Sequence, residues 1–219
     1  MAAPASAGCR LALALAMDVS KSVSLHDYDL QRDGMIAALA DAEVRDLFLR
    51  PGNHVTVLIY HWSGSNYQGV VSDWREVREV DDLIALSRDI ETHLRYARNL
   101  PTSIGAALEF GRQAMEDAPD CGRRVIDVAG DGRSNDGMSP EQAYAWEDFG
   151  DITVNGLAIG GHEAGLVDYY KSQVIRGPGA FVEVAGLPED FAQTLKRKLV
   201  RELAEQVSLL DQSPANSGG

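Results

Sequence analysis

The chain has 219 residues, enough for one large α/β domain or two small ones, and 45% of them are hydrophobic, which suffices for a substantial core. Its 20 Lys and Arg and 33 Asp and Glu residues give a formal net charge of −13. This charge repels phosphate backbones and anionic lipid, and no apolar run approaches the length of a transmembrane helix. We therefore expect neither a nucleic-acid partner nor membrane insertion.

Strand-like apolar runs alternate with segments of helical periodicity along nearly the whole chain. Over the first half, the pattern predicts strands at 10–17, 54–62 and 67–74 and helices at 25–48, 81–94 and 104–115. Ser24 and Asp27 have the spacing of an N-terminal cap for the first helix. The third strand follows the second after a tight turn, so we expect it to pair antiparallel at a sheet edge.

The second half continues the alternation. It predicts strands at 124–129, 152–159 and 180–184 and helices at 139–149, 165–175 and 187–209. This order indicates an α/β fold: a doubly wound, mostly parallel six-stranded sheet with one antiparallel edge strand and helices on both faces. We expect a single domain over 10–209, a flexible N-terminus over 1–9 and a disordered tail over 210–219.

Small oxygen-bearing side chains gather at the predicted carboxyl ends of the strands, where open parallel sheets bind ligands. The first strand ends at Asp18, with Ser20 and Ser22 following at alternate positions. Thr102 precedes a helix, and Asp131 follows the strand at 124–129. Hard cations such as Mg²⁺, Mn²⁺ or Ca²⁺ prefer oxygen ligands of this kind. We therefore expect these five residues, the candidate ligands, to form a metal site.

The stretch Asp18-Val-Ser20-Lys-Ser22, taken with Thr102 in Pro-Thr-Ser-Ile-Gly and Asp131 in Val-Ala-Gly-Asp-Gly, resembles a known site. It is similar to the metal-ion-dependent adhesion site (MIDAS) of von Willebrand factor A (vWA) domains, also found in integrin inserted domains. The resemblance covers roughly 10–205 and is closest to uncharacterised exported bacterial vWA proteins.

The resemblance implies a role for each candidate ligand. In that family the hydroxyls tend to be direct or near-direct ligands, the aspartates often act through water, and a partner's Glu or Asp commonly completes the shell. One departure is Gly130, because the family often has Thr before the last aspartate.

These features predict a metal-dependent binding module, and not an enzyme, that recognises a protein, peptide or other acidic ligand as a monomer. Two alternatives stay open: a metal-assisted hydrolase or phosphatase using Asp18 or Asp131, and a structural domain with a stabilising ion. Phosphatases of the haloacid-dehalogenase type need a second carboxylate where Ser20 stands. The stretch Gly-Asp131-Gly-Arg-Ser lacks the ending of a phosphate-binding P-loop.

Other residues at the same predicted sheet edge are candidates for the rim of the metal face. They are His61, Trp62, Asn66, Asn135 and His162. Asp127 lies four residues before Asp131 inside a strand, roughly 13 Å below the metal end at the usual strand rise. We expect Asp127 to belong to a structural network, because a buried carboxylate needs partners.

The two cysteines precede the two aspartates by nearly the same number of residues, so they lie at matching depths in the predicted sheet. Cys9 comes nine residues before Asp18, and Cys121 comes ten before Asp131. Neighbouring strands lie about 4.8 Å apart, which is within disulfide reach. We therefore predict a Cys9–Cys121 disulfide. With a small-residue N-terminus that resembles the region around a signal-peptidase site, this predicts a periplasmic or secreted protein.

Overall fold

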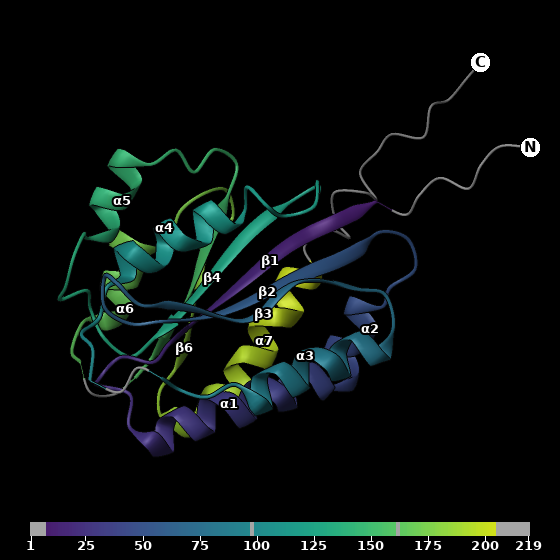
Figure 1. Cartoon of the computed structure of the whole chain (residues 1–219), viewed down its shortest axis with the longest axis horizontal. Coiled ribbons are helices and arrows are strands. Elements are labelled where there is room, and N and C mark those ends of the chain that lie inside the picture. Colours follow the sequence, from purple (N-terminus) through teal and green to yellow (C-terminus); the bar gives the residue numbers. More distant parts are fainter. Residues whose placement is uncertain (1–7, 97–98, 161–162, 205–219) are drawn as a thin grey trace, which may run out of the picture.

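A six-stranded sheet runs through the middle of the protein, with helices on both faces (Figure 1). The computed structural model describes residues 8–96, 99–160 and 163–204. The strands are β1 (Cys9–Asp18), β2 (His54–Trp62), β3 (Gln68–Val77), β4 (Arg124–Gly130), β5 (Thr153–Ile159) and β6 (Val182–Ala185). Their order in the sheet is β3-β2-β1-β4-β5-β6, and only β3 runs antiparallel to its neighbour. The predicted fold class is confirmed.

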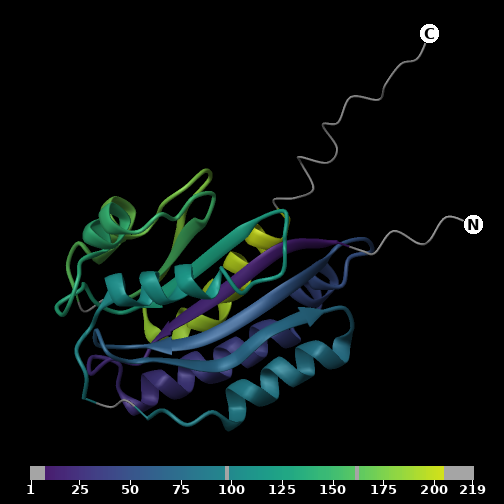
Figure 2. The same cartoon turned by 45° about the horizontal axis from the view of Figure 1, so that its top comes forward.

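The helices form two layers (Figures 1 and 2). One face is covered by α1 (Leu25–Ala40), α2 (Ala42–Phe48), α3 (Val80–Thr92) and α7 (Phe191–Ala204). The other is covered by α4 (Ile104–Ala114), α5 (Pro140–Trp146), α6 (Leu166–Tyr169) and a π-helical turn, η1 (Tyr170–Val174). A short 3₁₀ turn, η2 (Pro188–Asp190), leads into α7. Among the described residues, none of the helices combines the length and apolar character that crossing a bilayer requires.

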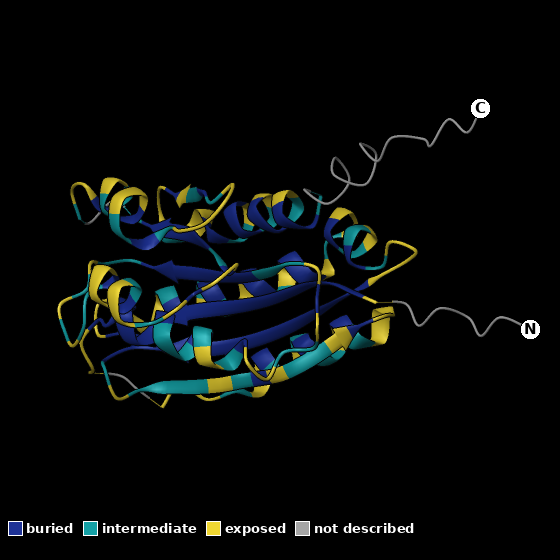
Figure 3. Ribbon diagram, turned by 90° about the horizontal axis from the view of Figure 1, so that it is seen from above, coloured by how far each residue is buried: buried dark blue, intermediate teal, exposed yellow. Residues whose placement is uncertain are grey.

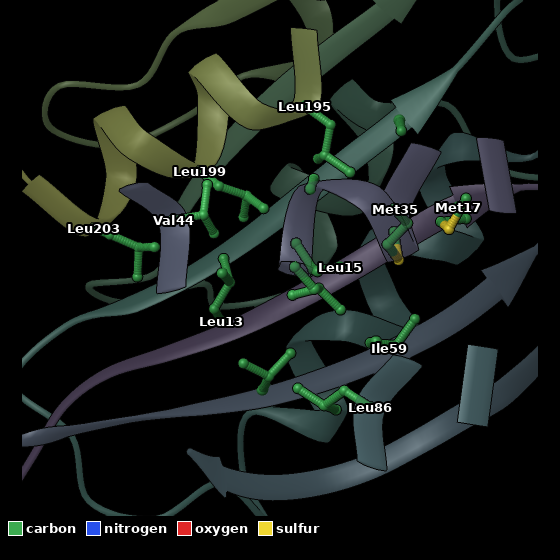
Figure 4. Packing of buried hydrophobic residues seen from close by; sticks show 14 of the residues in the cluster. Leu13, Leu15, Met17, Met35, Val44, Ile59, Leu86, Leu195, Leu199 and Leu203 are labelled. Carbon is green, nitrogen blue, oxygen red and sulfur yellow. The ribbon is translucent and has the colours of Figure 1, made fainter. Parts of the chain in front are cut away.

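The central strand β1 alternates large and small apolar side chains, and this alternation divides the core in two. Leu13, Leu15 and Met17 belong to the cluster that includes residues of α1 and α7, as Figure 4 shows. Ala14 and Ala16 belong to the other cluster, where α4 and η1 pack. All of β1 is buried, whereas the edge strand β3 carries intermediate and exposed residues (Figure 3). Each large side chain buried in this way contributes about 1.5–3 kcal/mol.

Several helices differ in their bounds from the predicted ones. The helix predicted over 25–48 is two helices, because Asp41 has extended backbone and accepts hydrogen bonds from the N–H groups of Glu43 and Val44. The helix predicted over 165–175 becomes α6 and the π-helical turn, and the last helix begins at Phe191 after η2. The predicted cap at Ser24 is confirmed as a capping box with Asp27. The predicted tail over 210–219 and residues 1–7 lie outside the described residues.

The two cysteines are joined at the amino end of β1. The Cys9–Cys121 disulfide has a Cα–Cα separation of 4.5 Å, and the two residues form an isolated parallel bridge next to the β1–β4 pairing. The predicted disulfide is confirmed, because β1 and β4 are adjacent and in the register that the matching depths require.

Candidate metal centre

The candidate ligands converge because β1 and β4 are neighbouring parallel strands. Asp18 ends β1, and Asp131 directly follows β4, so both lie at one edge of the sheet. Thr102 precedes α4, and the Lys21 N–H donates to the Leu100 carbonyl at 2.9 Å, which holds the loop after β1 beside the segment leading to Thr102. Three separate chain segments therefore meet at this edge.

Hydrogen bonds join the candidate ligands into one cluster. The Thr102 hydroxyl donates to Ser20 Oγ at 3.2 Å, and Ser20 Oγ lies 3.0 Å from Ser22 Oγ. The Ser22 hydroxyl donates to Asp131 Oδ1 at 2.6 Å, and the Ser20 N–H donates to Asp18 Oδ1 at 2.7 Å. All five oxygen-bearing side chains are therefore within one small volume.

Asp18 is the buried anchor of this cluster. Its side chain is fully buried, and Oδ2 has no hydrogen-bond partner among the described residues. Burial, with the neighbouring charge of Asp131, raises the pKa of Asp18 to about 7. An unpartnered buried carboxylate oxygen costs free energy that a cation can offset. The two carboxylates and three hydroxyls thus fit a hard divalent cation.

The donor set differs from that of a His- or Cys-based metal site. In the described part of the chain, no group of three or more His, Cys, Asp or Glu side chains is placed to hold a metal. A cation in this cluster would therefore depend on the hydroxyls as well as on Asp18 and Asp131. The hydroxyls are neutral and the two carboxylates only balance the charge of a divalent cation, so the cation would remain a Lewis acid for an incoming carboxylate.

An open hollow of about 630 Å³ lies over the cluster. Its described lining includes three candidate ligands, Ser22, Thr102 and Asp131, together with Lys21 and Arg133. The remaining lining residues are Asn99, Pro101, Gly132, Asn135 and Glu163. A carboxylate carried on a partner can therefore approach the cluster from solvent.

The loop after β4 fixes the position of Thr102. Asn135 Oδ1 accepts the Thr102 N–H at 2.9 Å, and the Asn135 N–H donates to the Thr102 carbonyl at 2.8 Å. Ser134 Oγ accepts the Ile104 N–H at 3.1 Å, so it satisfies a donor at the start of α4. The loop that supplies Asp131 therefore also orients the threonine.

Residues 8–207 match the family model described as Protein of unknown function (DUF1194). The chain belongs to this family. No curated protein is significantly similar to the DUF1194 chain in sequence.

Solved structures show which fold the DUF1194 chain shares. Proximal thread matrix protein 1 from the mussel byssus aligns with a TM-score of 0.67 at 15% identity over 90% of this chain. A von Willebrand factor type A structure from Catenulispora acidiphila aligns with a TM-score of 0.62 at 12% identity over 90% of this chain. The pilus adhesin SpaC from Lactobacillus rhamnosus GG aligns with a TM-score of 0.62 at 12% identity over 89% of this chain. The match covers 49%, 43% and 31% of those chains, which is less than half of each. The fold of the DUF1194 chain is therefore vWA-like.

Among the predicted rim residues that the structure describes, Asn135 lines the hollow and the others do not. His61 is buried, its ring 5.7 Å from that of Tyr28, and burial lowers its pKa to about 3. Trp62 is fully buried in the core cluster on the α4 side of the sheet, and its ring lies beneath the candidate ligands, where a Cβ on Gly130 would meet Cζ2 at 3.1 Å. Asn66 is exposed in a turn and is not among the described residues that line the hollow. Asn135 does line the hollow. His162 lies outside the described residues.

Gly130 marks where the DUF1194 chain departs from the usual vWA pattern. A Cβ at this position would lie 2.7 Å from Tyr170 Oη and 3.1 Å from Asp18 Oδ2. The Tyr170 hydroxyl of η1 therefore fills the space that a threonine side chain would need. Sequence reasoning missed Tyr170, because it lies far from the candidate ligands along the chain and follows no motif.

Proposed function

We propose that the protein is a metal-dependent binding module that holds a divalent cation with Asp18, Ser20, Ser22, Thr102 and Asp131. When bound, the cation would supply positive charge for a carboxylate from a protein or peptide partner. One observation carries this proposal. Five oxygen donors from three chain segments form one hydrogen-bonded cluster under an open hollow.

The cation that best suits this donor set is Mg²⁺, with Mn²⁺ or Ca²⁺ as alternatives. Mg²⁺ usually keeps several water ligands and uses only one or two carboxylates, and the open hollow leaves space for both waters and a partner. A structure of the mussel protein is described as having a zinc-occupied MIDAS motif, at 14% identity and a TM-score of 0.62 to this chain. That observation supports divalent cations in general.

We propose a binding role in preference to a metal-assisted hydrolase or phosphatase. A catalytic carboxylate must reach its substrate, and Asp18 is the fully buried member of the cluster. Asp131 is half-buried and accepts a hydrogen bond from Ser22. A panel of phosphoester and ester substrates with Mg²⁺ tests this choice. Metal-dependent turnover that disappears in Asp18→Ala would establish the enzyme instead.

Calorimetric titration tests the metal centre itself. Mg²⁺, Mn²⁺ and Ca²⁺ are titrated into the wild type, into Asp18→Ala and into Asp46→Ala, whose exposed carboxylate in α2 pairs only with Arg45 in the described structure. We expect the wild type and Asp46→Ala to bind alike and Asp18→Ala to lose at least about tenfold in affinity. Equal, weak binding by all three proteins rejects the centre.

A metal-dependent pull-down from the native source tests the partner. We expect a protein retained by the wild type with Mg²⁺ and released by a chelator or by Asp18→Ala. A large metal-induced rise in melting temperature with no retained protein would instead support a structural domain whose ion only stabilises the loops.

We also propose that the protein works in an oxidising compartment, as a periplasmic or secreted protein. The disulfide between Cys9 and Cys121 supports this, because disulfides persist in such compartments and are rare in the cytosol. Thiol alkylation in intact native cells, followed by mass spectrometry, should leave both cysteines unlabelled. Labelling of both would contradict export.

A further inference from the structure

A buried arginine holds the loop that carries three of the candidate ligands. Arg95 lies in the segment between α3 and α4 and is only 8% exposed. Its Nη2 donates to the carbonyls of Val19, Ser20 and Val23 at 3.0, 2.8 and 2.8 Å. Its Nη1 donates to the Ser24 carbonyl at 3.2 Å. One guanidinium thus binds four backbone carbonyls of a single short loop.

The loop needs such a partner because it leaves the sheet directly after Asp18. Buried carbonyls require donors. The carbonyls of Ser20 and Ser24 also accept the backbone N–H groups of Val23 and Tyr28, whereas Arg95 supplies the donor to those of Val19 and Val23. Four carbonyl oxygens facing one point also form a concave, electronegative surface that favours a cation. A guanidinium offers five donors in a rigid planar fork and stays charged, so it satisfies both requirements.

Rings around Arg95 keep its position defined. Its guanidinium lies 5.4 Å from the centre of the Tyr28 ring. The centre of the His61 ring lies 5.7 Å from that of Tyr28, and the centre of the His93 ring lies 4.9 Å from that of His61. Burial, together with His93 and Arg95, lowers the pKa of His61 to about 3, and burial also lowers the pKa of His93. Neutral histidines do not repel the guanidinium near neutral pH.

We propose that Arg95 is a positioning residue of the metal centre: it holds the 18–24 loop in the form that presents Asp18, Ser20 and Ser22 to the cation. This inference rests on the proposed function. The segment that carries Arg95 continues to Thr102, so the same side chain links the loop to the segment that supplies the fourth candidate ligand.

The sign of the effect on metal affinity separates positioning from electrostatics. A positive charge beside the loop repels a divalent cation, so removing the charge would by itself strengthen metal binding. If Arg95 positions the loop, Arg95→Met instead weakens metal binding, by roughly 10- to 100-fold as is typical for residues that orient metal ligands. Arg95→Lys keeps the charge but not the fork, and it should also weaken binding.

Arg10 provides a matched control. It is also 8% exposed, and its guanidinium donates to the carbonyls of Leu203 and Leu47, at the other end of β1. Arg10→Met therefore removes a buried guanidinium with carbonyl partners, far from the candidate ligands. Loss of general stability should be comparable in Arg10→Met and Arg95→Met.

The experiment measures Mg²⁺ and Mn²⁺ affinity by calorimetry in the wild type, Arg95→Met, Arg95→Lys and Arg10→Met, with backbone amide exchange over 19–24 in the metal-free proteins. We expect weaker metal binding and faster exchange in the Arg95 variants only. If Arg95→Met does not fold, Arg95→Lys decides alone.

Unchanged or tighter metal binding in the Arg95 variants, or an equal loss in Arg10→Met, would overturn the role of Arg95 while leaving the proposed function standing. A wild type that binds neither cation would overturn the proposed function, and the inference with it.

Discussion

At the residue scale, Gly130 occupies a position that leaves no room for a side chain. A Cβ there would lie 2.7 Å from Tyr170 Oη and 3.1 Å from both Asp18 Oδ2 and Trp62 Cζ2. We expect Gly130→Ala to lower the free energy of unfolding by about 1–3 kcal/mol, as overpacking does. Adding Tyr170→Phe should recover part of this loss, because the closest atom is the hydroxyl. Urea unfolding of the single and double variants measures both effects.

Gly132 is the control for this prediction. A Cβ on Gly132 would meet only Glu163 Oε2, at the ordinary contact distance of 3.7 Å. Gly132→Ala should therefore stay within about 0.5 kcal/mol of the wild type, since it strains no packed group. Equal losses in Gly130→Ala and Gly132→Ala would show that backbone freedom, and not the Tyr170 hydroxyl, explains the glycine.

The candidate ligands could be predicted from the sequence because each lies at the end of a recognisable element. Asp18 and Asp131 follow apolar strands, and parallel strands bring their carboxyl ends together. Arg95 could not be found in this way. Its four carbonyl partners lie more than 70 residues away in the chain, and no periodicity or motif marks an arginine that binds backbone. Metal ligation itself stays a prediction.

At the element scale, a buried charge network joins β4 to α7. Lys198 of α7 is fully buried and forms ion pairs with Asp127 of β4 and, at 3.1 Å, with Glu202. Glu202 also accepts a hydrogen bond from Asn155 of β5 at 2.7 Å. The predicted structural network around Asp127 is confirmed. Because one ammonium serves two carboxylates, burial and the Glu202 charge raise the pKa of Asp127 to about 7.

This network predicts a pH-dependent difference between the wild type and Asp127→Asn. The pKa of Asp127 rises from 3.8 to about 7 on folding, so the native state binds more protons between these values. The stability that this carboxyl contributes is complete below about pH 4 and is lost as the pH rises through 7. Asparagine does not titrate. We expect the wild type to lose on the order of 3 kcal/mol relative to Asp127→Asn between pH 4 and 8.

Urea unfolding of both proteins across this pH range measures the difference. The carboxyl of Asp18, whose pKa is also raised, titrates in both proteins and cancels from the comparison. A constant difference in unfolding free energy from pH 4 to 8 would mean that Asp127 stays ionised in the folded protein.

Helix boundaries show the limit of periodicity as a signal. The apolar spacing continues across Asp41, so the pattern predicts one helix over 25–48. The structure breaks it, because the Asp41 side chain caps the next helix and Lys196 of α7 pairs with the same carboxylate at 3.0 Å. The second contact is a tertiary one, and it leaves no trace in the local pattern. Helical periodicity likewise does not predict the π-helical turn that follows α6.

At the scale of the whole molecule, the sheet could be predicted because its central strands are largely apolar and buried, whereas the edge strand β3 mixes polar and apolar residues. The order of the elements then restricts the topology, since crossovers between parallel strands follow few rules. β1 links the candidate ligands to the disulfide. The candidate ligands lie at its carboxyl end, and the disulfide lies at its amino end.

Removing the disulfide should therefore lower stability without changing metal binding. Cys9 and Cys121 are 112 residues apart in sequence, and a cross-link over a loop of about 100 residues stabilises by about 4.7 kcal/mol through loss of chain entropy in the unfolded state. The double variant Cys9→Ser/Cys121→Ser leaves no free thiol to form wrong pairs, and urea unfolding measures its loss of stability. Its affinity for Mg²⁺ should equal that of the wild type, because β1 separates the disulfide from Asp18 by about 30 Å at the usual strand rise. A loss of metal affinity in a variant that is still folded would show that strain at the amino end of β1 reaches the metal loop, and that the two ends of the strand are not independent.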